Sequence, residues 1–141
     1  MAREPIYTAH AHVTGGRVNG HGKTDDGGLE VDLRRPKEMG GEGDGTNPEQ
    51  LFAAGYAACF GSAVELVGRR MKQDVSDAKV TAHVGIGATG DGGFGLEVEL
   101  HVDLPHADEA EAVVEKAHKV CPYSNATRGN IEVKLVVPAA A

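Results

Sequence analysis

Cys59 and Cys121 are the side chains in this sequence best suited to nucleophilic or redox chemistry. Cys59 lies in the middle of an apolar segment, where a cysteine is ordinarily an unreactive small hydrophobic residue and where burial raises the pKa of the thiol. A reactive thiolate there needs a basic partner from elsewhere. Arg17 is a candidate, because the preceding Thr14-Gly15-Gly16 turn lets the backbone approach a packed helix closely. A guanidinium about 4 Å away could lower the thiol pKa by about three units before desolvation is subtracted. An inert core cysteine and an activated thiolate both remain open.

Two other patterns could suggest bound cofactors. The segment Gly85-Ile86-Gly87-Ala88-Thr89-Gly90 matches G-x-G-x-x-G, but an alternating strand follows it, so no helix N-terminus is available to hold a pyrophosphate. His10 and His12 would share a strand face, yet no cysteine lies near them and the sequence has no H-E-x-x-H motif. The first pattern therefore predicts a hairpin turn, and we expect no metal site.

The N-terminal elements that would position these residues follow from hydrophobic periodicity and turn residues. Residues 6–23 and 29–33 predict three short antiparallel strands joined by glycine turns. Residues 34–46 are rich in glycine and predict a loop. Asn47 is a good N-cap for a helix from Pro48 to about Met71. Because most of this helix is apolar on nearly every side, we expect it to be buried all round, at a domain centre or a subunit interface.

The C-terminal half is predicted to contain a hairpin, a second helix and a last strand. Residues 79–86 and 94–104 predict a β-hairpin, residues 108–120 a second helix that Pro122 ends, and residues 131–137 a last strand. Strand runs separated by two helices, without regular alternation, indicate an α+β fold. We expect a single domain over residues 1–141, with a meander and glycine loop at 1–46, a central helix at 47–72, and strands and second helix at 78–137.

Composition excludes several classes of partner. The chain has 141 residues and a net charge of −7, and its basic residues do not cluster beyond pairs, which argues against nucleic acid and anionic membranes. The start lacks the apolar region of a secretory signal, and the longest apolar run, Leu51 to Val64, is 14 residues, too short to span a bilayer. Reduced cysteines in the cytoplasm are therefore expected.

Three segments, in this order, resemble the organic hydroperoxide resistance proteins, the Ohr branch of the OsmC/Ohr superfamily. They are Thr14–Arg17, Gly45–Phe60 and Val120–Asn130. The Cys-Pro-Tyr-Ser-Asn-Ala-Thr-Arg-Gly-Asn stretch in the third segment points to the Ohr branch rather than its OsmC sister. The resemblance spans essentially the whole chain.

The resemblance implies a thiol peroxidase that reduces alkyl and fatty-acid hydroperoxides to alcohols without metal, haem or flavin. Cys59 would be the peroxidatic cysteine and Cys121 the resolving one, while Arg17 and Glu49 would hold and activate Cys59. The implied fold is an intertwined α+β homodimer, with antiparallel sheets wrapped around long central helices and active sites at the subunit interface. The implied reductant is dihydrolipoamide or a lipoylated protein.

Helix geometry constrains how such a site is assembled. Glu49 and Cys59 are ten residues apart, so about 15 Å of helix axis separates them and a direct contact is excluded. Either a bend lets Arg17 reach between them, or Glu49 comes from the second chain. We predict a site shared between subunits.

Apolar residues around Cys59 suggest the substrate. Phe52 and Phe60 offer a lining for an alkyl tail, and Met39 beside the glycine loop could act as a mobile gate. Judged from the sequence without the family resemblance, these two aromatic residues could equally belong to the hydrophobic core. Two other functions remain as alternatives: a cysteine-based peroxide sensor, which is oxidised once without turnover, and a hydrophobic-ligand binding module that does not need Cys59.

Overall fold

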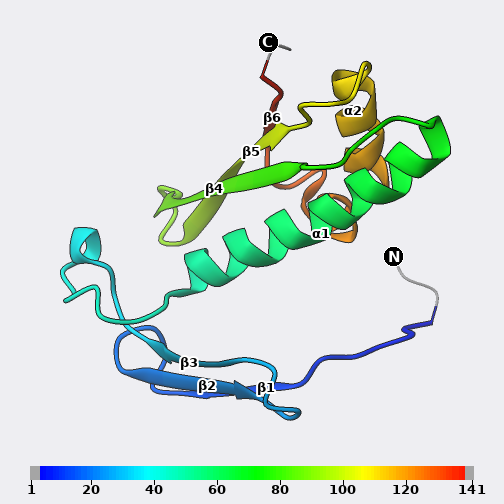
Figure 1. Ribbon diagram of the computed structural model, residues 1–141. Coiled ribbons are helices and arrows are strands. Elements are labelled where there is room, and N and C mark those ends of the chain that lie inside the picture. The colour runs from blue at the N-terminus through cyan, green and yellow to red at the C-terminus, as the bar shows by residue number, and fades with distance from the viewer. Residues whose placement is uncertain (1–3, 139–141) are drawn as a thin grey trace. The chain divides into compact units, whose positions relative to one another are not determined.

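The computed structural model describes residues 4–138 and divides into two compact units, Met1–Leu51 and Phe52–Ala141 (Figure 1). The first unit contains a three-stranded antiparallel meander in the order β1-β2-β3. Its strands are β1 (Ala11–Thr14), β2 (Gly20–Thr24) and β3 (Glu30–Leu33). The predicted meander is confirmed.

The glycine-rich segment after β3 is not wholly irregular. It contains a single turn of 3-10 helix, η1 (Lys37–Met39), which the prediction of a loop missed. Pro36 enters this turn in an extended conformation, and Gly40 ends it with a φ of 86°, a left-handed conformation that glycine adopts without strain. The segment returns beside β3, where Thr46 forms a parallel bridge with Leu33.

Helix α1 (Pro48–Met71) has the predicted bounds. The Asn47 side chain caps it, because its Oδ1 accepts a hydrogen bond from the Gln50 backbone N–H at 2.8 Å. The prediction of burial on every side is wrong for the single chain. One face is buried through residues such as Tyr56, whereas Ala54 and Ala58, four residues apart on another line of the helix, are exposed.

The length of α1 also corrects the sequence-based statement about membranes. The helix has 24 residues and a mean hydropathy of 1.5 over its most apolar window, so by length and composition it could cross a bilayer. The 14-residue apolar run from Leu51 to Val64 underestimated the length of the apolar helix, because the helix continues beyond both ends of that run. A single helix of this kind is weak evidence for a membrane span, since core helices of soluble proteins have the same composition.

The second unit contains a sheet in the order β4-β5-β6. Strands β4 (Lys79–Ala88) and β5 (Phe94–Asp103) form the predicted hairpin, and the first part of the G-x-G-x-x-G segment lies in β4 rather than in the turn. Strand β6 (Val133–Val136) pairs with β5 in parallel. The expectation of purely antiparallel sheets is therefore wrong here, because two helices intervene between β5 and β6 and return the chain in the same direction.

Those two helices are α2 (Ala110–Val120) and α3 (Pro122–Thr127). Helix α2 begins two residues later than predicted, and Pro122 does end it. However, Pro122 also occupies the first position of α3, where its missing N–H costs nothing, so the chain continues as a short helix to Thr127.

The core of this unit lies between the sheet and the helices (Figure 1). Alternate residues of β5, namely Val98, Leu100 and Val102, are buried against one face of α1 and against α2. Cys121 belongs to this core and Cys59 packs against it. The α+β architecture is as predicted.

Candidate active site

The two thiols meet inside the second unit. The Sγ atoms of Cys59, on α1, and Cys121, between α2 and α3, are 3.8 Å apart, and both cysteines are free thiols. Cys121 is fully buried and Cys59 is half-buried, so Cys59 is the one that solvent or substrate can reach. The end of α2 therefore delivers Cys121 to Cys59.

Local hydrogen bonding fixes the position of Cys121. Its backbone N–H closes the last turn of α2 by donating to the Ala117 carbonyl at 2.9 Å, while its own carbonyl accepts from the Asn125 N–H at 2.9 Å and so opens α3. Its backbone is extended, with φ −65° and ψ 124°, because the residue before a proline avoids the helical conformation. Cys121 is therefore the joint between two helices, and its thiol points into a rigid core.

The environment raises the pKa of the Cys59 thiol above its ordinary value. Burial is the main cause, and the neighbouring Cys121 thiol adds to it, whereas a hydrogen bond from the Tyr123 backbone N–H acts in the opposite direction by stabilising the thiolate. No lysine or arginine among residues 52–138, the described part of the second unit, contributes to this shift. Lowering the pKa of this thiol would therefore need a positive charge from outside those residues.

An aromatic cluster lies one helical turn before Cys59. The Tyr123 ring packs against Tyr56 and Phe52, with ring centroids 5.6 and 6.1 Å away. Gly55 makes this contact possible, because a Cβ at that position would lie 2.9 Å from the Tyr123 hydroxyl oxygen. Tyr123 remains partly exposed, so this cluster offers apolar surface near the reachable thiol.

A buried polar network fastens α3 to α1. The Tyr56 hydroxyl and the Ser124 hydroxyl are hydrogen-bonded at 2.7 Å, and His118 Nδ1 lies 2.7 Å from the same Ser124 oxygen. Burial, and secondarily Arg128, lowers the pKa of His118 and so favours its neutral form. This network and Tyr123 were missed as positioning residues. The only sequence signal for Tyr123 and Ser124 is the Cys-Pro-Tyr-Ser segment itself, since Tyr56, which both of them contact, lies more than sixty residues away in the sequence.

A second candidate group lies in the first unit, where Arg17 and Glu49 form a bidentate ion pair. Arg17 Nη1 donates to Glu49 Oε2 at 3.0 Å, and Nη2 donates to Oε1 at 2.9 Å. The pairing raises the pKa of Arg17 and lowers that of Glu49. The structure thus brings these two candidate residues together, while their role toward Cys59 stays a prediction. It holds the guanidinium plane fixed while leaving other N–H groups free for a further acceptor.

The predicted substrate residues occupy different environments. Phe52 is half-buried in the aromatic cluster, and Met39 is exposed at the end of η1. Phe60 has no exposed surface and packs near the His118 ring, which favours the core interpretation for this residue in the single chain.

Comparison with known proteins adds to this geometry. The family model described as OsmC-like protein matches residues 41–136. The chain belongs to the OsmC/Ohr family. The matched range includes both cysteines and Glu49, whereas Arg17 lies before it.

Individual members of the OsmC/Ohr family are similar over nearly the whole chain. A protein named organic hydroperoxide resistance protein from Xanthomonas axonopodis pv. citri is 52% identical over 136 residues, which cover 94% of each chain. The organic hydroperoxide resistance protein OhrB of Bacillus subtilis is 44% identical, over 92% of this chain and 96% of its own. The crystal structure of an organic hydroperoxide resistance protein from Legionella pneumophila matches with a TM-score of 0.91 and 53% identity, covering 96% of this chain and all of that one. This chain is therefore similar to members named for organic hydroperoxide resistance.

Proposed function

We propose that this protein is a cysteine-based peroxidase that reduces organic hydroperoxides to alcohols and so defends the cell against organic peroxide stress. The observation that carries the proposal is the pair of free thiols, 3.8 Å apart, of which one is accessible and the other is held in the core. A reachable nucleophile beside a fixed second thiol is the arrangement that a two-cysteine peroxide cycle needs. The names of the similar proteins support the substrate class.

The cycle begins with the Cys59 thiolate. It attacks the distal oxygen of the hydroperoxide, the O–O bond breaks, and the leaving alkoxide takes a proton to become the alcohol. Cys59 is now a sulfenic acid. The Cys121 thiol attacks that sulfur, a disulfide forms, and water leaves. A dithiol then reduces the disulfide by two exchange steps and is itself oxidised to a disulfide.

Arg17 is proposed to lower the pKa of Cys59 and to stabilise the negative charge spread over sulfur and oxygen in the transition state. Glu49 would aim the guanidinium through the bidentate pair. About 15 Å of helix axis separates positions 49 and 59 of α1, so we propose that the pair reaches Cys59 from the second chain of a homodimer. The exposed face of α1 at Ala54 and Ala58 is available for close helix packing in such a dimer.

Substrate preference and recycling complete the proposal. Phe52 and Tyr123 would line the approach to Cys59 and favour alkyl tails over hydrogen peroxide, with Met39 as a gate. The proposed reductant is dihydrolipoamide or a lipoylated protein, and the proposed compartment is the cytoplasm. The cycle needs no bound cofactor.

The test is consumption of cumene hydroperoxide and of hydrogen peroxide by the purified protein with dihydrolipoamide as reductant. We expect many turnovers on the organic substrate, slower reaction with hydrogen peroxide, and no reaction with Cys59→Ser. Cys121→Ser should retain the first oxidation but lose efficient turnover. A single oxidation of the wild type without turnover would instead favour a sensor, and equal activity in the Cys59→Ser protein would remove Cys59 from the chemistry.

A further inference from the structure

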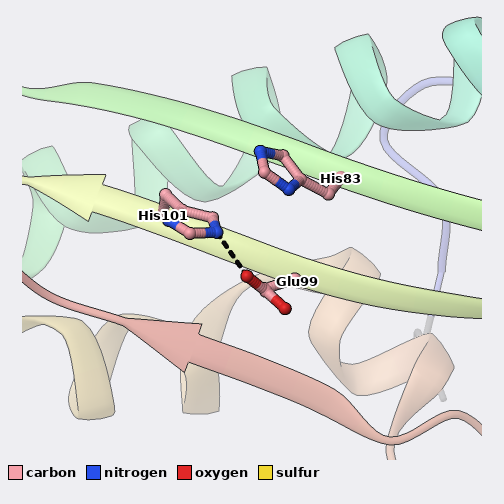
Figure 2. A group of neighbouring side chains, drawn as sticks. All are labelled: His83, Glu99 and His101. Carbon is pink, nitrogen blue, oxygen red and sulfur yellow. Dashed lines mark hydrogen bonds and ion pairs between the residues drawn. The ribbon is translucent and has the colours of Figure 1, made fainter.

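Three potential metal-ligating side chains gather on the sheet of the second unit, apart from the thiols (Figure 2). They are His83 of β4 and Glu99 and His101 of β5, and one ligand atom from each lies within 4.8 Å of the other two. His101 Nε2 and Glu99 Oε1 are 2.5 Å apart, and the two imidazole rings stack with centroids 4.4 Å apart. Local sequence spacing gives no sign of this group, because His83 and Glu99 are sixteen residues apart and lie on different strands.

Strand register creates the cluster. His83 pairs directly with Glu99, and His101 follows Glu99 by two residues, so all three side chains project from the same face of the hairpin. The alternate residues Val98 and Leu100 project from the opposite face into the core against α1. The cluster therefore lies on the face of the hairpin opposite the core, to which Cys121 belongs and against which Cys59 packs. Figure 2 shows the three side chains on this face, with the helices on the other side of the strands.

We propose that His83, Glu99 and His101 form a binding site for a divalent transition-metal ion of the Zn²⁺ type. Two imidazole nitrogens and one carboxylate oxygen are a ligand set that suits Zn²⁺, Cu²⁺ and Ni²⁺ better than Mg²⁺ or Ca²⁺. In a tetrahedral zinc site with bonds of about 2.1 Å, ligand atoms are about 3.4 Å apart. Side-chain rotations that close a separation of at most 4.8 Å are enough to reach this geometry, and water would complete the coordination.

The surroundings favour a cation. A groove of about 840 Å³ borders the cluster and includes His83 and Glu99 in its lining. Its other charged residues are Glu97, Glu132 and Lys134. Counting Glu99, the groove is lined by three carboxylates and one ammonium group. Lys134 lies opposite Glu99 in the β5–β6 register and lines the same groove, so its positive charge opposes a bound cation. Removing this ammonium should strengthen metal binding.

The test is calorimetric titration of the full chain, without a histidine tag, with Zn²⁺. Cys59 and Cys121 are both replaced by serine in every protein, so that the paired thiols cannot bind the ion. We expect saturable binding of one ion per chain, weakened by about tenfold or more in either His83→Gln or His101→Gln. Lys134→Gln should bind more tightly, and Mg²⁺ should give no saturable binding.

His21→Gln is the matched control. His21 also lies on a strand beside two carboxylates, Asp32 at 2.8 Å and Glu30 at 2.9 Å, but within residues 4–138 these side chains do not form a metal-ligating group with a second imidazole. It should bind Zn²⁺ as its parent does. Equal affinity in His83→Gln and its parent, or equal binding of Mg²⁺ and Zn²⁺, would overturn the proposal. Because His83 is exposed, its substitution should leave the metal-free unfolding midpoint unchanged, which distinguishes loss of a ligand from loss of the fold.

Discussion

One equivalent of an alkyl hydroperoxide per chain should join Cys59 to Cys121 within the same chain. The Sγ atoms start 3.8 Å apart and must approach to about 2.05 Å, a closure of under 2 Å. Cys121 is held by hydrogen bonds from two helices, so most of this movement should come from rotation of the more exposed Cys59 side chain. The fold should therefore survive oxidation.

The expected gain in stability follows from the loop that the bond would close. The two cysteines are 62 residues apart, and cross-linking a loop of this length removes enough denatured-state entropy to stabilise the fold by up to about 4 kcal/mol. For a chain of this size, each kcal/mol of added stability raises the thermal unfolding midpoint by about 3 °C, so this midpoint should rise by up to about 12 °C. Any strain that the disulfide causes in the folded state reduces this maximum gain in stability.

The assay compares urea and thermal unfolding of reduced and oxidised protein, with thiols counted in both samples. Oxidised wild type should have lost both thiols, should remain a single chain on a non-reducing gel, and should return to the reduced curve with a dithiol. Cys121→Ser treated in the same way should have a modified Cys59 but no increase in midpoint. Cys59→Ser should keep its remaining thiol.

Two outcomes would refute this reasoning. If both thiols disappeared while the unfolding midpoint stayed the same, the bond would not close the 62-residue loop. If oxidation produced covalently linked chains instead, the pairing would be between subunits, and Cys121 would not resolve Cys59 of its own chain.

Three further predictions concern other parts of the molecule. Arg17→Met should raise the pKa of Cys59 by up to about three units, because the substitution removes a guanidinium that contributes about 4 kcal/mol from about 4 Å away, while the Glu49 carboxylate is present in both proteins. Thiolate absorbance measures this, and an unchanged pKa would exclude Arg17 as the activating charge. Gly68→Ala should lower the free energy of unfolding by about 1–2 kcal/mol, because the new Cβ would lie 2.8 Å from both Val75 methyl groups and this overpacking exceeds the gain in helix propensity. Urea unfolding measures the loss. Adding Val75→Ala to the same chain should restore stability. The ion pair with Arg17 lowers the folded-state pKa of Glu49 below the 4.5 of a free glutamate. The ionised carboxylate should therefore contribute its full stability above pH 4.5, and this contribution should be lost as the pH falls through the folded-state pKa. Unfolding measured from about pH 6 to pH 3 should detect this loss in wild type and find it reduced in Glu49→Gln.

The sequence by itself determined those features that depend on neighbouring residues. The bounds of α1 follow from an asparagine cap, a proline at the first helical position and a long apolar run, all of which act within a few residues. The β4–β5 hairpin follows from alternation on both sides of a glycine-rich turn. The resemblance, carried by short motifs, also singled out Cys59, Cys121, Arg17 and Glu49 as candidates. The structure brings the two thiols together and pairs Arg17 with Glu49.

Only the tertiary structure decided the features that join distant segments. The 3.8 Å approach of the thiols, the Tyr123 ring over Gly55 and the parallel pairing of β6 with β5 each depend on where α2 and α3 return the chain. The His83 cluster likewise depends on strand register, which brings together residues that no local spacing connects. Local propensities are additive along the chain, whereas these contacts arise from packing of side chains far apart in sequence, and that packing is what places one thiol within reach of the other.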